Sequence, residues 1–524
     1  MKMNLLNTLK SVDFVKVMMI STFLIAFGFI FGGVVLSKVI KMVMKMQLRI
    51  TPGTMSRDIY EKVPFAIDMR YFFFNITNPD EVMAGGQPHL NEIGPYYFEE
   101  WKTKVDIIDD NAEDTMEYDY INTIYFRPDL SAPGLTGDEF VVLAHPLVLG
   151  MAMSIKRERP ELLELISNAI NGLFHDPENI FFSGRLFDLL FDGIDLDCSS
   201  EAFEIKGVCS ELGSDDQPKV TVINETTYSF ALFDHGNGSS IGRFKVMRGK
   251  KNIRDLGKIV ELNGETVQDI WYDDECNQVD GTDGTIFPPF MKKEEGVQVF
   301  VAQLCRSFVA NYKHPSKVSG IKTSHYEVNV TASADCYCSE EARRCPAQGQ
   351  FDIMPCVGAP ITVTLPHFHE ADPSLMDNIK GGIHPIPEKH SFYFDFYDFA
   401  GAPISAAGRF QLNFEVEPVQ QIEMMNNLQP MLLPFAWFEN GVDLKKKFVN
   451  MLKYQLILGL RLKKMLKISC IIFGFLGLIV GSTMGYLQMN EETMNKTKAV
   501  QVQAAAIENE IFDDQKDDNH DEQK

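Results

Sequence analysis

The sequence lacks the short motifs that mark common nucleotide-binding and zinc-protease sites. It contains no phosphate loop, no H-E-x-x-H pair and no dinucleotide fingerprint. Positive charge is scarce as well, because 49 Lys and Arg stand against 72 Asp and Glu, for a net charge of −23. Nucleic acid is therefore not an expected partner. No internal repeat is visible, and a chain of 524 residues normally forms two or more domains.

Two stretches of the chain, residues 17–36 and 468–487, lack charge altogether. As helices, each would span about 30 Å, the thickness of the hydrocarbon core of a bilayer. The first is too long for a cleavable signal peptide and has no small-residue cleavage site, so we interpret it as a signal anchor. We therefore predict transmembrane helices at 17–36 and 468–487, tails at 1–16 and 488–524 on one side, and residues 37–467 on the other.

Cysteine is sparse outside one block, residues 276–356, which holds six of the nine cysteines: Cys276, Cys305, Cys336, Cys338, Cys345 and Cys356. This density predicts a disulfide framework formed in an oxidising compartment. A zinc site is the alternative, because three of these cysteines are clustered. From Cys336 through Cys338 and Cys345 to Cys356, the spacings are one, six and ten intervening residues, which differ from the roughly two to four that separate paired zinc ligands. Cys198 and Cys209 are close enough in sequence to bridge each other.

Two conflicting signals indicate the side of the membrane on which residues 37–467 lie. Four sequons in the central stretch predict N-glycosylation outside the cell: Asn75, Asn224, Asn237 and Asn329. Basic residues flank both spans on this same side: Lys38, Lys41, Lys45, Arg49, Arg461, Lys463, Lys464 and Lys467. The positive-inside rule would place these flanks in the cytoplasm, but long domains translocate largely regardless of charge. We therefore expect residues 37–467 outside, both tails in the cytoplasm, and the fifth sequon at Asn495 unmodified.

Two polar segments adjoin the spans. Residues 38–49 are basic and Met-rich, and either continue the first span as a stalk or lie along the membrane surface as a helix. The stalk is the simpler interpretation. After Asn490 the chain carries ten Asp and Glu against four Lys. This composition predicts a disordered acidic tail.

Helices are predicted over residues 158–193. Apolar residues recur at helical spacing from Leu162 to Phe174. Asp176-Pro177 supplies a cap and a first-turn proline for a second helix, which would end at Gly193. Its apolar residues are Phe181, Phe182, Leu186, Phe187, Leu189, Leu190 and Phe191. A helix that is apolar nearly all round is either buried or faces lipid.

Strand patterns dominate the remainder of the central stretch. Residues 63–75 and 96–101 form apolar, aromatic runs bounded by turn residues. Residues 409–416 alternate strictly between apolar and polar side chains, and residues 392–396 carry phenylalanine at every second position. Alternation with Gly and Pro between strands indicates an antiparallel sheet or barrel. The fold class is therefore α+β.

Few residues are candidates for catalysis or metal binding. Residues 238–242 match the G-x-S-x-G elbow with Ser240 as nucleophile, but a hairpin loop explains this polar turn better, because the elbow needs a strand before it and a helix after it. His367 and His369 would share one face of a strand, although no third metal ligand is evident nearby. We therefore predict no catalytic residue, no metal and no cofactor.

Several motifs resemble the CD36 family. They are Glu92-Ile93-Gly94-Pro95-Tyr96, Cys276-Asn277, residues 281–290 (GTDGTIFPPF), Cys305-Arg306-Ser307 and Leu365-Pro366-His367-Phe368, together with the two end spans. Within that family, residues 98–102 and 126–137 resemble the insect sensory neuron membrane proteins, their first subtype more than their second. The acidic tail is longer than the resemblance leads us to expect.

The resemblance implies an antiparallel, β-barrel-like ectodomain capped by an apical helical bundle at 158–193, with a lipid tunnel running towards the membrane. It also implies the disulfides Cys276–Cys336, Cys305–Cys356 and Cys338–Cys345, whereas Cys198–Cys209 lies outside the family pattern. The implied function is a receptor in the dendritic plasma membrane of olfactory neurons. Its partners would be pheromones, fatty-acid-like lipids, the odorant receptor complex and odorant-binding proteins.

On this basis we expect Phe181, Phe182 and Phe187 to form an apolar ligand entrance. Three rival functions remain open at this point. A scavenger-type lipid uptake receptor would share the fold. A two-span ligand-gated channel would share the topology, although Ser482 and Thr483 alone give its spans little polarity. A lipase would depend on Ser240.

Overall fold

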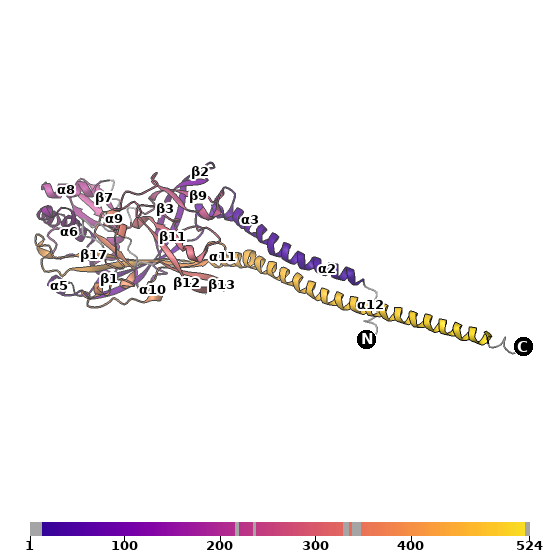
Figure 1. The fold of residues 1–524 in the computed structure, drawn as a ribbon. Helices are drawn as coiled ribbons and strands as arrows, with labels where there is room; N and C mark the ends of the chain where they lie inside the picture. Colours follow the sequence, from indigo (N-terminus) through magenta and orange to yellow (C-terminus); the bar gives the residue numbers. More distant parts are fainter. Residues whose placement is uncertain (1–12, 215–218, 234–236, 329–334, 338–346, 519–524) are drawn as a thin grey trace. The chain divides into compact units, whose positions relative to one another are not determined.

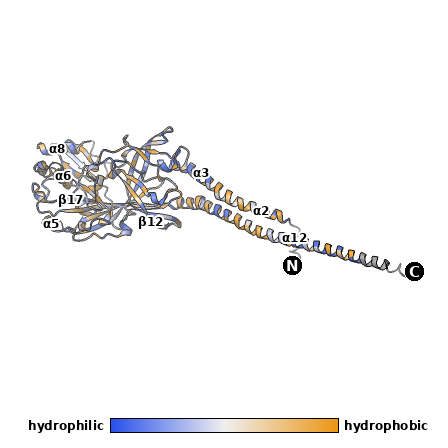
Figure 2. Cartoon of the chain, in the orientation of Figure 1, coloured by the Kyte–Doolittle hydropathy of each residue, from blue (hydrophilic) through white to orange (hydrophobic). Residues whose placement is uncertain are grey.

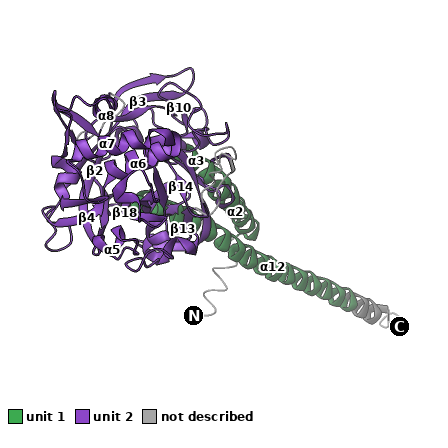
Figure 3. Cartoon of the chain, turned by 90° about the vertical axis from the view of Figure 1, so that its left-hand side faces the viewer, with its two compact units in different colours: residues 1–44, 450–524 green, residues 45–449 purple. Residues whose placement is uncertain are grey.

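Residues 13–214, 219–233, 237–328, 335–337 and 347–518 are the part of the chain that the computed structural model describes. The chain divides into two units, one of residues 1–44 and 450–524 and one of residues 45–449 (Figure 3). The division agrees with the sequence pattern, because the first unit contains both charge-free stretches.

The first unit is helical. Near the N-terminus α2 (Phe14–Phe27), a π-helical segment η1 (Gly28–Val35) and α3 (Leu36–Leu48) follow one another, and near the C-terminus α11 (Lys446–Met451), η11 (Leu452–Ile457) and α12 (Leu458–Asp518) do the same (Figure 1). Two continuous helices, Phe14–Leu48 and Lys446–Asn509, are long and apolar enough to cross a membrane. Their apolar residues dominate α2 and the part of α12 beside it (Figure 2).

Small residues line the contact between α2 and α12. A Cβ atom at Gly477 would lie 2.1 Å from Ser21 Oγ, and one at Gly474 would lie 2.4 Å from Ile25. Gly481 and Gly485 contact the first turns of α2 in the same way. Glycine therefore allows the backbones to approach closely, which is how helices associate in lipid, where burial of apolar surface gives little driving force.

The expected disorder after Asn490 is wrong for most of the tail, because α12 continues to Asp518. Half of residues 491–518 are Ala, Gln, Glu or Lys, which are strong helix formers. Extending a helix that already exists avoids the unfavourable nucleation step. The acidic composition, from which disorder was predicted, gave no sign that the helix continues into the tail.

The second unit is built on a sheet of 13 antiparallel strands, in the order β10-β9-β3-β2-β1-β18-β17-β16-β13-β12-β11, with β15 beside β17 and β14 beside β15 (Figure 1). The strands are β1 (Ile67–Ile76), β2 (Leu90–Asp110), β3 (Thr115–Phe126), β9 (Ser240–Met247), β10 (Ile259–Leu262), β11 (Val297–Val301), β12 (Arg306–Val318), β13 (Ile321–Val328), β14 (Phe351–Asp352), β15 (Ile361–Thr364), β16 (Tyr393–Tyr397), β17 (Ala402–Val416) and β18 (Met431–Asp443). A mixed helix and sheet fold with a large antiparallel sheet is therefore confirmed.

Residues 281–282 contact both end strands of this path. Isolated bridges join Thr282 to Lys258 beside β10 and to Val299 in β11. In addition, Ile259 N donates to Gly281 O at 2.9 Å and Phe300 N donates to Thr282 O at 2.9 Å. The pairing of the named strands leaves the sheet open, and residues 281–282 connect its two ends.

A smaller set of elements packs on the main sheet at one end of it. Strand β4 (Phe140–Ala144) pairs with β5 (Phe181–Arg185), and β6 (Ile194–Asp197) pairs with β8 (Thr227–Phe230), which pairs with β7 (Val220–Asn224). The helices are α6 (Pro146–Glu158), η2 (Pro160–Leu162), α7 (Leu163–Phe174), η3 (Asp188–Asp192) and α8 (Phe203–Leu212). We call these the apical elements.

The helix predicted over residues 158–174 is present as η2 and α7, but the second predicted helix is present only in its C-terminal part. Residues 181–185 form β5, and residues 186–192 are helical and end at Gly193 as predicted. His175 and Asp176 both have positive φ angles, so Asp176 does not cap a helix. Phe181 and Phe182 are both buried, and periodicity cannot distinguish such a short apolar strand segment from a buried helix.

Short helices and turns complete the described residues: α4 (Met55–Glu61), α5 (Pro79–Met83), α9 (Met354–Val357), α10 (Pro387–His390), η4 (Ile253–Asp255), η5 (Lys293–Glu295), η6 (Ala302–Leu304), η7 (Asp335–Tyr337), η8 (Pro366–Phe368), η9 (Pro373–Met376) and η10 (Glu423–Met425). Three apolar clusters form the core. The largest joins the apical elements to β1, β2 and β18, a second lies among β11–β17, and a third lies under β3, β9 and β10.

Candidate functional site

Aromatic rings form an unbroken series of contacts through the second unit, from the apical elements to the loop before β11. The contacts and their ring-centroid distances are Phe187–Phe191 (5.1 Å), Phe191–Phe233 (5.8 Å), Phe233–Tyr71 (5.0 Å), Tyr71–Phe438 (5.6 Å), Phe438–Phe410 (6.1 Å), Phe410–Phe392 (5.4 Å), Phe392–Phe394 (5.3 Å) and Phe394–Phe287 (6.0 Å). All lie within the range in which aromatic pairs attract. We call this series the aromatic path.

The rings in the middle of the aromatic path are surrounded by protein but keep some solvent-accessible surface. Tyr71 on β1 is directly opposite Phe438 on the adjacent strand β18. Its ring contacts those of Phe73, Phe98, Phe233 and Phe438. Burial raises the pKa of Tyr71 above its ordinary value, yet Tyr71 and Phe438 both keep some accessible surface.

The three phenylalanines expected at a ligand entrance lie in different surroundings. Phe181 and Phe182 are in the core, 5% and 8% exposed. Phe187 is partly exposed and packs against Phe126 with a centroid distance of 4.9 Å. A Cβ atom at Gly137 would lie 2.1 Å from the Phe187 ring, so glycine is needed there. Phe187 is the one of the three that belongs to the aromatic path, and the entrance itself stays a prediction.

A buried ion pair lies where β2 meets the Gly-Thr-Asp-Gly-Thr run. Lys104 Nζ is 3.1 Å from Asp283 Oδ2 and donates to Thr285 Oγ1 at 2.9 Å. The side chains of Lys104 and Asp283 are each only 1% exposed. The ammonium also lies 3.7 Å from the centre of the Tyr60 ring and 4.7 Å from that of Tyr120, a favourable cation–π arrangement. We call these five residues the Lys104 cluster.

The electrostatics of the Lys104 cluster keep Asp283 ionised. Burial alone would raise the pKa of Asp283, but Lys104 and the hydrogen bonds from Thr285 outweigh it, so the pKa lies below the ordinary value. Burial lowers the pKa of Lys104. The hydroxyls of Tyr60 and Tyr118 lie 3.2 and 3.0 Å from Asp283 Oδ2. The cluster fixes the Gly-Thr-Asp-Gly-Thr run against the sheet and carries no net charge.

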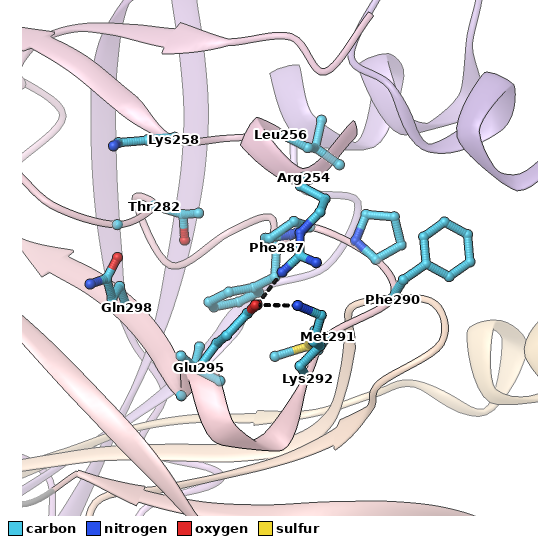
Figure 4. A pocket seen from close by; sticks show the side chains of 15 residues that line it. Arg254, Leu256, Lys258, Thr282, Phe287, Phe290, Met291, Lys292, Glu295 and Gln298 are labelled. Atoms are coloured by element: carbon cyan, nitrogen blue, oxygen red, sulfur yellow. Dashed lines mark hydrogen bonds and ion pairs between the residues drawn. The ribbon is translucent and has the colours of Figure 1, made fainter. Parts of the chain in front are cut away.

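A cavity of ≈170 Å³ lies beside this run (Figure 4). Its lining residues are Arg254, Leu256, Lys258, Gly281, Thr282, Phe287, Pro288, Pro289, Phe290, Met291, Lys292, Glu295, Gly296, Val297 and Gln298. Phe287, the last ring of the aromatic path, lies in its wall. The sequence analysis did not identify the cavity, although six of its fifteen lining residues come from residues 281–290, the Gly-Thr-Asp-Gly-Thr-Ile-Phe-Pro-Pro-Phe run on which the family resemblance depends.

The structure has disulfides between Cys198 and Cys209, Cys276 and Cys336, and Cys305 and Cys356, with Cα–Cα distances of 6.1, 5.7 and 5.9 Å. Cys338 and Cys345 lie outside the described residues, so their pairing stays a prediction. Among the described residues, Cys470 in α12 is the cysteine with a free thiol.

The two histidines of the His-Phe-His run do not face the same way. They lie in and after the turn η8, where His367 has a positive φ angle, and not on a strand. His367 Nε2 is 2.6 Å from Glu92 Oε2, whereas His369 Nε2 contacts Ser391 Oγ at 3.1 Å. No group of three metal-binding side chains occurs in the described part of the chain. The prediction that His367 and His369 share one face of a strand is therefore wrong.

Ser240 opens strand β9 and is exposed. Its Oγ accepts from Gly242 N at 3.2 Å, within the same turn. A strand, not a helix, follows the G-x-S-x-G match, so the residues do not form a nucleophile elbow.

Three sequons fall in described residues of the second unit. Asn224 is exposed at the end of β7, and its Oδ1 accepts from the backbone and hydroxyl of Thr226, both at 2.9 Å. Asn75 and Asn237 are tied to neighbouring backbone, since Asn75 Oδ1 accepts from Val142 N at 2.7 Å and Asn237 Nδ2 donates to Ile124 O at 3.0 Å. Asn329 lies outside the described residues.

Comparison with known proteins covers nearly the whole chain. A model of the CD36 family matches residues 19–484. Sensory neuron membrane protein 1 of Anopheles gambiae is 41% identical over 495 residues, which are 93% of this chain and 90% of that protein. The proteins of the same name from Aedes aegypti and Manduca sexta are 41% and 37% identical, over 84% and 87% of this chain and 82% and 88% of their own.

Proposed function

The chain belongs to the CD36 family, and on that premise we propose that it captures hydrophobic odorants, such as lipid-derived pheromones, and delivers them through its ectodomain to the membrane and an odorant receptor. The aromatic path is the observation that supports this proposal most directly. Tyr71 and Phe438 are surrounded by other rings yet remain partly accessible, as expected for side chains that line an internal space.

The contacts that residues 281–282 make with both ends of the sheet support the same proposal. Because residues 281–282 contact both end strands, the sheet can curl into a barrel-like wall around that space. The apical elements would then cap one end of this wall, and Phe187 would be the first ring of the aromatic path there. Such a conduit offers a long-chain odorant a route out of water, which is favourable by about 0.8 kcal/mol for each CH₂ group.

We further propose that residues 37–467 lie outside the cell and both tails lie in the cytoplasm, in the dendritic membrane of olfactory neurons. The proposed macromolecular partners are the odorant receptor complex and odorant-binding proteins, and the proposed role is not enzymatic. The relatives are named sensory neuron membrane protein 1, which supports a sensory membrane receptor in general terms.

This topology predicts a glycan on Asn224, because its side chain is exposed and already hydrogen-bonded to Thr226 in the sequon. Asn224→Gln should increase the electrophoretic mobility of protein from insect cells by one glycan, and glycosidase treatment should remove the difference. Asn495→Gln is the matched control in the cytoplasmic tail and should not change the mobility. A glycan on Asn495 and none on Asn224 would reverse the orientation.

Ligand-binding measurements test whether long-chain ligands occupy an internal space beside Tyr71. Purified full-length protein should bind a fluorescent long-chain lipid saturably, and pheromone-like acetates and aldehydes should displace it. Tyr71→Trp should weaken binding by roughly tenfold, since it fills the space that a few CH₂ groups would occupy. Val309→Trp, at a 41% exposed position on β12, is the matched control and should not change the affinity.

Equal effects of these two substitutions would contradict binding within the sheet. The ranking of the competitors separates two functions of the same fold, because preference for fatty acids over pheromone-like acetates would favour a scavenger-type uptake receptor.

A further inference from the structure

The part of α12 that follows the second charge-free stretch is exposed at every residue from 491 to 509. Two of these residues have large aliphatic side chains, Val500 at 64% and Ile507 at 57% exposure. Helices in proteins owe most of their stability to the packing of an apolar face, because helix propensity alone gives only marginal stability in water. A long exposed helix that carries such side chains therefore indicates that another helix covers them.

The apolar side chains of this segment follow a heptad. Six residues are separated by alternating steps of four and three: Thr493, Thr497, Val500, Ala504, Ile507 and Ile511. These are the spacings of the d and a positions of a coiled coil. The hydroxyls of Thr493 and Thr497 donate to the backbone oxygens of Met489 and Thr493 in the same helix, both at 2.8 Å. A partner can therefore cover both threonines without leaving a hydroxyl unsatisfied.

The charges along this segment allow identical helices to meet. Residues 499–507 carry no charge, although the tail as a whole is acidic. In parallel copies aligned in register, Lys496 of one helix lies nearest Gln501 of the next, and Gln503 lies nearest Glu508. Neither pair has like charges. The acidity of the tail therefore does not oppose association of copies along this stretch.

The direction of the helix selects the partner. From Gly485 to Asp518, α12 continues without a further Gly and without Pro (Figure 1). Because sharp kinks in helices need such residues, the tail leads away from the bilayer and does not lie flat on its surface. Copies of the chain in one membrane share one orientation, so their tails are parallel and their heptads begin at the same height. A parallel coiled coil requires this arrangement.

We propose that residues 493–511 bind further copies of this chain as a parallel coiled coil. Val500, Ala504 and Ile507 form the centre of the interface, where the small side chain of Ala504 lets the helices approach closely. The proposal does not rest on odorant delivery, and it holds for either orientation of the chain in the membrane. It gives a role to the part of the tail that is longer than the family resemblance leads us to expect.

Disulfide cross-linking of full-length protein in lipid vesicles tests this interface. The background variant Cys470→Ser removes the free thiol of α12. In that background Ile507→Cys should form a covalent dimer on oxidation with copper phenanthroline, because d positions of parallel helices face each other. Val502→Cys is the matched control, since Val502 is 69% exposed and lies on the opposite side of the helix. It should give at least about tenfold less dimer.

A second substitution tests the apolar face with the same readout. Val500→Asp should abolish the cross-link of Ile507→Cys, whereas Val502→Asp should leave it unchanged. Equal cross-linking at positions 502 and 507, or none at either, would overturn the proposal and assign the helix to another partner. A cross-link that disappears when the vesicles are diluted with excess lipid would show random collision and would overturn it too. Loss of odorant uptake with the cross-link intact would contradict only the proposed delivery.

Discussion

Replacing Cys305 by serine is expected to hold most of the protein inside the cell. The Cys305–Cys356 disulfide closes a loop of 51 residues, which corresponds to about 4 kcal/mol in the loop-closure treatment. A domain is typically stable by only about 5–15 kcal/mol in total. Cys305 also anchors the preceding segment, because its carbonyl oxygen accepts from Trp271 Nε1 at 2.8 Å and from Gln268 Nε2 at 3.3 Å.

The substitution further frees Cys356, which can then pair with another cysteine of the block. Surface biotinylation should find a small fraction of the Cys305→Ser protein at the plasma membrane, with glycans that remain sensitive to endoglycosidase H. Cys470→Ser is the matched control, because Cys470 has a free thiol, and it should reach the surface as the unmodified protein does. Equal surface delivery of the two variants would show that the Cys305–Cys356 bond is not needed for folding.

Replacing Lys104 by methionine is expected to lower the free energy of unfolding by about 3–5 kcal/mol, because it leaves the carboxylate of Asp283 buried without its cation. Asp283→Asn should have an effect of similar size, since it leaves the ammonium unpaired. The double variant Lys104→Met/Asp283→Asn should be much closer to the original protein than either single variant, because both charges are then absent. Thermal and denaturant unfolding of full-length protein measure all four forms.

A matched control and a pH series sharpen this test. Lys322→Met removes an exposed lysine from the same sheet and should change stability by less than about 0.5 kcal/mol. The folded-state pKa of Asp283 lies below its unfolded value, so its contribution to stability is complete above the unfolded value and is lost as the pH falls through the folded one. Asp283→Asn should remove that acid-sensitive part. Additive effects of the two single substitutions would mean that the charges do not interact.

The sequence predicted the parts of the fold that follow from hydropathy and period. Both charge-free stretches lie in helices long enough to span a bilayer, and the strictly alternating residues 409–416 lie in β17. The CD36 resemblance, which depended on short motifs around the cysteine block, is confirmed by the match over residues 19–484. Such signals are local, so one sequence is enough to read them.

What the sequence did not predict depends on contacts between distant segments. Two polar residues of β17, Gln411 and Asn413, are also fully buried. Their burial is possible because both are hydrogen-bonded: Gln411 accepts from His367 N at 2.7 Å, and Asn413 donates to Thr362 O at 2.9 Å. The first part of the apolar run, residues 181–185, is a strand because β4 pairs with it. The cavity needs Lys258, which precedes β10, and Gln298 from β11 beside Thr282, and only the folded sheet brings them together.

The most direct test of odorant delivery is the rate at which a long-chain pheromone acetate passes from an aqueous carrier into vesicles that contain the full-length protein. The proposal predicts faster uptake than into protein-free vesicles. It also predicts a rate reduced at least about tenfold by Phe438→Lys, which places a charge in the aromatic path, and an unchanged rate for Val309→Lys on the exposed side of β12. Uptake that is no faster with protein than without it, or that both lysine variants change equally, would contradict a route through the ectodomain.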